Sequence, residues 1–202
     1  MTQTSLIQIF AKPPVEGLVK TRLSSLLPSS AILGLYMELL EQTLLEVAKC
    51  RAAGEIWEAW NTRDQPFLAF GLPVRLQKGA NLGERMSYSL TDGLSRFEKV
   101  ILIGCDLPLV DAPYLHRALE SLDDHECVIG PAEDGGYGLV GVRRSIPDIF
   151  EDVSWGSKSV LEQTCSKLNA QSVNFSLLPL VWDLDRPIDF ERYMKMKKNL
   201  RF

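Results

Sequence analysis

Short apolar runs of strand type alternate with helical patterns along this chain, and that alternation constrains the fold more than any other feature. The clearest strand is VILIG, Val100 to Gly104, and the clearest helix follows Pro28, where apolar residues recur at helical spacing as far as Val47. Strands that alternate with helices form a largely parallel sheet covered on both faces. We therefore expect a three-layer α/β architecture.

The same criteria predict the remaining elements. Ser29 and Ser30 offer caps for the long helix, and Asn81 offers a cap for a helix over 82–97. No repeat, low-complexity tract or charged linker divides the chain, so we expect a single domain over residues 1–202. Further strands are expected at 5–10, 55–60, 73–77, 127–130, 137–142 and within 173–185, and further helices at 113–122, 158–168 and 187–198.

Composition narrows the classes of function. The 202 residues carry a formal net charge of -4, whereas long nucleic acids are normally bound by a broad basic surface. No apolar run reaches the roughly eighteen residues of a membrane helix, and the first residues lack the basic region of a signal peptide. The four cysteines form no Cys-x-x-Cys pair, so neither a zinc module nor a redox motif is predicted. We expect a soluble, cytoplasmic protein that binds neither nucleic acid nor membrane, and the sequence leaves its oligomeric state open.

Basic residues and a glycine gather in AKPPVEGLVKTRL, the loop after the first predicted strand. Ligands of parallel sheets bind beyond the carboxyl ends of the strands, and polyphosphates need positive charges with converging N–H donors. The loop matches neither the P-loop nor the dinucleotide-binding pattern, and a solvated basic loop is the alternative interpretation. We expect phosphate contacts from Lys12, Gly17, Lys20, Thr21 and Arg22.

Two acidic segments also follow predicted strands. Asp106, in GCDLP, comes directly after VILIG, where a carboxylate on a rigid turn suits a hard cation such as Mg²⁺ or Mn²⁺. In WDLDRPIDF, alternation puts Asp183 and Asp185 on one face. Two such charges about 4 Å apart repel by roughly 4 kcal/mol at an effective dielectric constant of about 20, unless a cation joins them. Helix capping or turn formation is the alternative role for these carboxylates.

Glycine-rich and aromatic segments indicate further ligand contacts. In GPAEDGGYGLVG, the glycines permit a sharp turn that would present Asp134 and Tyr137, although D-G-G also suits a plain hairpin. The loop QKGANLGERM, which contains Gly83 and Arg85, enters a predicted helix and could bind a base or a sugar. Trp155, in VSWGS, could stack on an acceptor or simply pack.

These six motifs occur in an order that resembles a known family. The sequence is similar to the rSAM/selenodomain-associated transferases, also described as arsenosugar-biosynthesis-type glycosyltransferases, of the GT-A or nucleotide-diphospho-sugar transferase superfamily. The resemblance covers residues 7–190. It implies a three-layer α/β/α fold with a Rossmann-like mixed sheet that contains one antiparallel strand. It also implies a nucleotide over the first loop and a divalent cation, Mg²⁺ or Mn²⁺, near Asp106.

The resemblance implies roles for individual residues. Phosphate contacts fall on Lys12, Lys20 and Arg22, and nucleotide contacts fall near Gly83 and Arg85. The cation falls on Asp106, with Asp185 as a second ligand. The acceptor side comprises Asp134, Gly135, Gly136 and Tyr137.

The favoured function is a metal-dependent transferase that moves a sugar from a nucleotide-diphospho-sugar to a small acceptor. Lys20 and Arg22 would stabilise the leaving diphosphate together with the cation, and Asp134 would take the acceptor proton. The chain departs from the Asp-x-Asp motif of sugar-transferring members, since Pro108 stands at the second acidic position. That form is similar to guanylyl- or cytidylyl-type nucleotidyltransferases, which join a nucleoside triphosphate to a small phosphorylated substrate and release pyrophosphate. An inactive nucleotide-binding regulatory module is the third alternative.

The net charge of -4 conceals a segregated distribution. Residues 1–22 hold three basic side chains against one acidic, whereas residues 104–137 hold eight acidic against one basic. A basic loop facing an acidic rim suits a small nucleotide held with a cation.

Overall fold

A computed structural model describes residues 4–199 of the chain. The strands are β1 (Ser5–Ala11), β2 (Ala53–Glu58), β3 (Val74–Leu76), β4 (Lys99–Gly104), β5 (Cys127–Pro131), β6 (Tyr137–Val142) and β7 (Phe175–Leu177). The α-helices are α1 (Ser29–Ala48), α2 (Leu82–Leu94), α3 (Ala112–Asp124), α4 (Val160–Ala170) and α5 (Pro187–Asn199). Two short 3₁₀ helices, η1 (Thr21–Leu23) and η2 (Pro66–Phe70), lie in loops.

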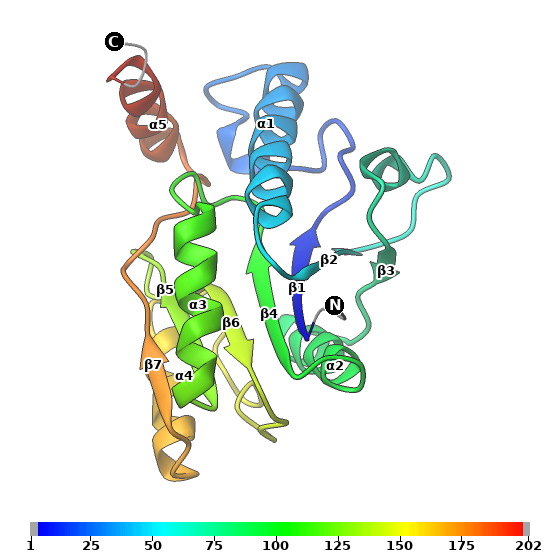
Figure 1. Ribbon diagram of the computed structural model, residues 1–202. Helices are drawn as coiled ribbons and strands as arrows, with labels where there is room; N and C mark the ends of the chain where they lie inside the picture. The colour runs from blue at the N-terminus through cyan, green and yellow to red at the C-terminus, as the bar shows by residue number, and fades with distance from the viewer. Residues whose placement is uncertain (1–3, 200–202) are drawn as a thin grey trace.

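The strands form one sheet in the order β3-β2-β1-β4-β6-β5-β7. Neighbouring strands pair in parallel except at β6, which is antiparallel to both β4 and β5. Helices α1 and α3 cover one face of the sheet, and α2 and α4 cover the other (Figure 1). The expected three-layer α/β/α fold with a mixed sheet is therefore confirmed.

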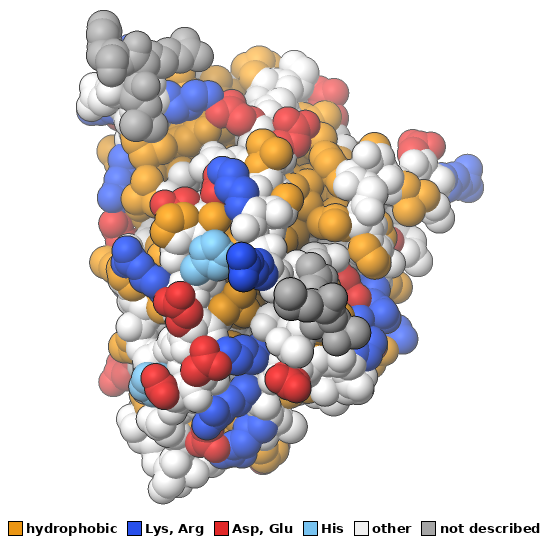
Figure 2. Space-filling model, in the orientation of Figure 1, with side chains coloured by type: hydrophobic (Ala, Val, Ile, Leu, Met, Phe, Trp, Pro, Cys, Tyr) orange, Lys and Arg blue, Asp and Glu red, His pale blue; other side chains and the backbone are white. Residues whose placement is uncertain are grey.

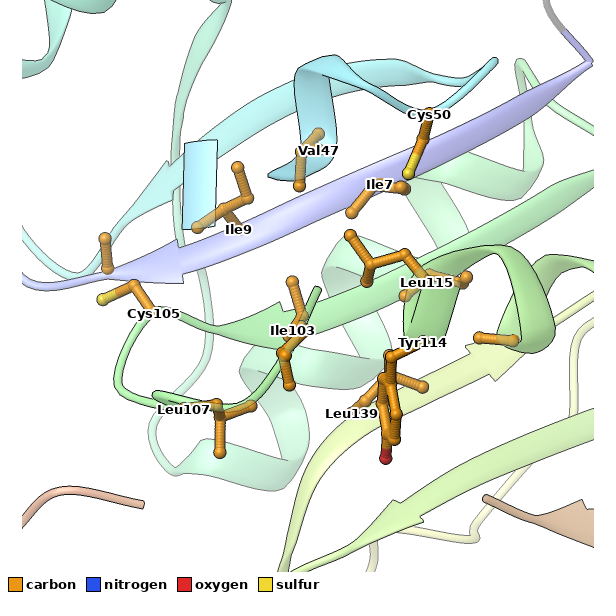
Figure 3. Close-up of a cluster of buried hydrophobic side chains, with 14 of the residues drawn as sticks. Ile7, Ile9, Val47, Cys50, Ile103, Cys105, Leu107, Tyr114, Leu115 and Leu139 are labelled. Atoms are coloured by element: carbon orange, nitrogen blue, oxygen red, sulfur yellow. The ribbon is translucent and has the colours of Figure 1, made fainter. Parts of the chain in front are cut away.

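Alternation along the central strands divides the core between the two faces. Ile7 and Ile9 of β1 and Ile103 of β4 are fully buried on the α1/α3 face, where Figure 3 shows them packed with Leu115 of α3. Leu6, which precedes Ile7 in β1, is buried with residues of α2 and α4 on the opposite face. The apolar runs are thus continuous because both faces of the sheet are covered.

A few expected boundaries were wrong. Ser29 and Ser30 do not cap α1 but begin it, because Pro28 holds the extended N-cap position with no side-chain cap bond. The helix expected over 82–97 ends at Leu94. The last strand, expected within 173–185, is found there as the three residues of β7, and the chain from 182 to 185 is irregular.

The topology gathers the candidate loops at one edge of the sheet. The loops after β1, β3 and β4 all leave from carboxyl ends of parallel strands. Because β6 is antiparallel to both β4 and β5, β5 runs in the same direction as β4, and the D-G-G turn that joins β5 to β6 also lies at this edge. Segments far apart in sequence are therefore neighbours there.

The surface gives two further findings. Basic and acidic side chains are interspersed over the face shown in Figure 2 rather than gathered into a continuous basic surface, as far as the described residues go. Within residues 4–199, none of the helices has the length and apolarity that crossing a membrane requires.

Candidate active site

A salt bridge joins the loop after β1 to the turn after β4. Lys20 Nζ lies 2.8 Å from Asp106 Oδ2, and the Lys20 side chain is only 6% exposed. Burial alone would lower the pKa of Lys20, but the Asp106 carboxylate reverses this effect and raises it. Burial likewise opposes ionisation of Asp106, but the Lys20 ammonium holds the pKa of that carboxyl below its usual value. The predicted phosphate loop and the predicted cation ligand are therefore in direct contact.

The other predicted phosphate contacts lie around this pair. Arg22 forms an ion pair with Asp185 and keeps 65% of its side chain exposed. Lys12 is exposed, and its charge also lowers the pKa of Asp106. Gly17 has φ +79°, a left-handed conformation that favours glycine, and Thr21 is exposed at the start of η1. Lys20 thus points inward, while Lys12 and Arg22 remain accessible to an incoming anion.

Tyr36 of α1 ties the two loops together. Its hydroxyl donates to the Lys12 carbonyl oxygen at 2.7 Å and accepts from the Cys105 thiol at 3.4 Å. Burial raises the pKa of Cys105 to about 11, which keeps it a thiol that donates. On the other side, the Leu184 N–H donates to the Asp106 carbonyl oxygen at 2.9 Å. Sequence reasoning missed Tyr36 because its helical spacing marks it only as a core residue.

A pocket of about 300 Å³ opens beside Asp106. Asp134 and Asp183 share its lining with Asp106. Asp134 is oriented by the Gly136 N–H, which donates to Oδ1 at 2.8 Å. The pKa of Asp183 is raised to about 6, mainly by burial and further by the like charges of Asp106 and Asp134. Gly136, Tyr137 and Trp155 of the predicted acceptor side also line this pocket.

The structure places Asp183, rather than Asp185, in the pocket with Asp106. Asp185 instead faces Arg22, and Asp189 Oδ2 accepts from the backbone N–H of Asp185 at 3.2 Å. Strand alternation predicts both aspartates on one face. The segment that carries them is irregular, so the two side chains have different neighbours.

The residues present fit an open cation site. Within residues 4–199, no cluster of three or more His, Cys, Asp or Glu side chains is positioned to enclose a metal. Mg²⁺ commonly needs only one or two carboxylates, with water and substrate phosphates as its other ligands. Asp106 and Asp183 supply two such carboxylates at one pocket, and their like-charge repulsion would be relieved by a cation.

The D-G-G turn packs against the start of α4 and also lines the pocket. Gly135 has φ +90°, and a Cβ at this position would lie 2.2 Å from the Lys158 carbonyl oxygen. The Leu161 N–H donates to the Gly135 carbonyl oxygen at 3.0 Å. Gly135 is therefore required for close contact with the start of α4, whereas Gly136 faces the pocket.

Gly83 and Arg85 lie at the amino end of α2 but do not line this pocket. A Cβ on Gly83 would lie 2.6 Å from the Phe150 carbonyl oxygen and 3.0 Å from the Trp155 ring. The absence of a side chain at Gly83 therefore lets α2 pack closely against the loop before α4. Arg85 Nε donates to the Gly79 carbonyl oxygen at 3.2 Å. The expected Asn81 cap is confirmed, because its side chain accepts from the Glu84 N–H at 3.0 Å.

Comparison with known proteins agrees with this architecture. A family model described as "Uncharacterized protein conserved in bacteria (DUF2064)" matches residues 38–157. The crystal structure of a provisionally named nucleotide-diphospho-sugar transferase from Desulfovibrio desulfuricans G20 is 30% identical, with a TM-score of 0.93 over 98% of this chain and 89% of that one. A search of curated proteins found no match.

Two more distant structures share the fold alone. CMP:2-keto-3-deoxy-manno-octonic acid synthetase in complex with CTP is 13% identical, with a TM-score of 0.62 over 98% of this chain and 99% of that one. The 4-diphosphocytidyl-2C-methyl-D-erythritol synthase of Anaerococcus prevotii DSM 20548 is 10% identical, with a TM-score of 0.63 over 96% of each chain. The chain therefore belongs to the DUF2064 family and has the α/β fold of nucleotide-diphospho-sugar transferases, within the GT-A superfamily.

Proposed function

We propose that the protein is a metal-dependent glycosyltransferase that moves a sugar from a nucleotide-diphospho-sugar to a small acceptor. The observation that carries this proposal is the Lys20–Asp106 salt bridge, which joins a basic loop to an acidic pocket at the carboxyl edge of the sheet. The name of the 30% identical relative supports the same class of donor. The narrower resemblance to rSAM/selenodomain-associated transferases stays a prediction.

The basic loop would bind the donor diphosphate. Lys12 and Arg22 are exposed and would make the first contacts with phosphate oxygens. A bound divalent cation, Mg²⁺ or Mn²⁺, would neutralise the diphosphate, and Asp106 would hold it, with Asp183 better placed than Asp185 as the second ligand. Lys20 would then move from the carboxylate toward the phosphates, since both compete for the same ammonium group.

The transfer would proceed between the loop and the pocket. The acceptor hydroxyl oxygen forms a bond to the anomeric carbon, and the bond from that carbon to the diphosphate oxygen breaks. The electron pair leaves with the nucleoside diphosphate, whose charge Lys20 and Arg22 stabilise. Asp134, held in orientation by the Gly136 N–H, takes the hydroxyl proton.

A thermal-shift screen tests the donor class. Nucleotide-diphospho-sugars and nucleoside triphosphates are added with and without Mn²⁺ to the wild type, to Asp106→Asn, and to Asp64→Asn as an exposed control outside the site. We expect Mn²⁺-dependent stabilisation by one nucleotide sugar, loss of that stabilisation in Asp106→Asn, and no change in Asp64→Asn. Retained Mn²⁺-dependent binding in Asp106→Asn would refute the metal assignment.

Nucleotidyl transfer is the second candidate, favoured by Pro108 at the position where Asp-x-Asp motifs have their second carboxylate. The reaction product separates the two proposals, because glycosyl transfer releases a nucleoside diphosphate and nucleotidyl transfer releases pyrophosphate. Nucleotide binding without release of either product would favour a regulatory module.

A further inference from the structure

The pocket beside Asp106 is apolar over most of its lining. Leu102 and Val140, register partners across β4 and β6, line it from the sheet. Leu82 and Met86 line it from α2. Trp155 lines it from the loop before α4, where its ring meets the Tyr137 ring edge-on at 6.3 Å. These surfaces favour burial of a hydrocarbon or aromatic group over a polyol.

The charges at this pocket disfavour an anionic ligand. Among the described residues, its charged lining side chains are Asp106, Asp134 and Asp183. The Lys20 ammonium, which contacts the lining at Asp106, is already paired with that carboxylate. With the proposed cation on Asp106 and Asp183 already neutralised by the donor diphosphate, a phosphorylated acceptor would still meet the uncompensated carboxylate of Asp134. The phosphates of the donor find basic side chains in the loop after β1.

We propose that this pocket binds the acceptor as an uncharged alcohol that carries an apolar group about one ring in size. The inference rests on the proposed glycosyl transfer, and it names the chemical class of the acceptor. A volume of about 300 Å³ lies at the lower end of the range for small-molecule sites, which limits the buried group to a single ring or a short chain.

The polar side of the pocket fits the hydroxyl of such an acceptor. Asp134 Oδ1 accepts from the Gly136 N–H, which leaves the other carboxylate oxygen available to accept the acceptor O–H. Gly136 and Gly138 line the pocket without side chains, so the acceptor can approach the backbone closely. A Cβ on Gly138 would lie 2.6 Å from the Leu107 side chain, so a larger residue here would have to displace that side chain.

Three probes test the inference: an uncharged alcohol with an apolar ring, its phosphate ester, and a polyol without a ring. Benzyl alcohol, benzyl phosphate and glycerol are titrated into the full chain, and binding is followed by saturation-transfer NMR. Leu82→Asn removes an apolar wall at a residue that is 45% exposed, and Leu45→Asn is the matched control at a 64% exposed leucine on α1. We expect benzyl alcohol to bind at least about tenfold more tightly than either other probe, and Leu82→Asn alone to weaken it about fourfold.

Three results would overturn the inference: tighter binding of benzyl phosphate, no binding of benzyl alcohol, or weakening by Leu45→Asn instead of Leu82→Asn. The last result would place the ring in the apolar groove beside α1. A parallel titration with nucleotide sugars and Mn²⁺ separates this outcome from failure of the proposed function. Binding of benzyl alcohol without binding of any nucleotide sugar would refute the proposed glycosyltransferase. Binding of a nucleotide sugar without binding of benzyl alcohol would refute only the proposed class of acceptor.

Discussion

Replacing Tyr36 with phenylalanine is expected to loosen the contact between the two loops that form the site. The ring is 3% exposed and stays in place, so the change removes only the hydroxyl, which donates to the Lys12 carbonyl oxygen at 2.7 Å and accepts from the Cys105 thiol at 3.4 Å. A partly buried carbonyl group left without its partner costs about 1 to 2 kcal/mol, and the thiol bond adds little. We expect the free energy of unfolding to fall by about 1 to 2 kcal/mol.

Urea unfolding at pH 7.5, followed by circular dichroism, measures this loss. Tyr193→Phe is the matched control, because the Tyr193 hydroxyl donates to Glu38 Oε1 at 2.6 Å and joins α5 to α1 away from the phosphate loop. Both variants are expected to lose stability, but only Tyr36→Phe is expected to weaken nucleotide binding, by up to about tenfold. Equal nucleotide affinity in the two variants, or a stability loss in Tyr36→Phe below about 0.5 kcal/mol, would refute the reasoning.

Three further substitutions test separate parts of the site. Lys20→Met leaves Asp106 without its cation and is expected to lower the free energy of unfolding by about 1 to 3 kcal/mol at pH 7.5. Because the folded-state pKa of Asp106 is lowered, thermal melts should show this difference shrinking as the pH falls below the ordinary value of 3.8. Asp183 has a raised pKa of about 6, so its ionisation destabilises the fold as the pH rises from about 4 to 6. Asp183→Asn should therefore be more stable than the wild type at pH 7.5 and equal to it near pH 4. Gly135→Ala would place a methyl group 2.2 Å from the backbone just before α4 and should lower the melting temperature more than Gly17→Ala, where the φ is similar but no atom lies within 4 Å.

Local patterns were sufficient to predict most of the elements. The apolar run Val100–Gly104 and the helical spacing after Pro28 each correspond to an element that the structure contains. Such patterns work because a strand or helix that buries one or both faces must place its apolar residues at a fixed period. Boundaries were less accurate, as at β7, because the length of an edge strand depends on the neighbour with which it pairs.

The sequence by itself determined which loops carry basic and acidic residues at the ends of strands. Only the tertiary structure decided which of these side chains meet: Lys20 turns inward to a carboxylate 86 residues away, and Arg22 reaches one 163 residues away. It also placed Asp183, rather than Asp185, in the pocket. The physical reason is that these contacts are set by strand order, and the free energy that fixes strand order is spread over the whole sheet and both helical layers rather than encoded in any one motif.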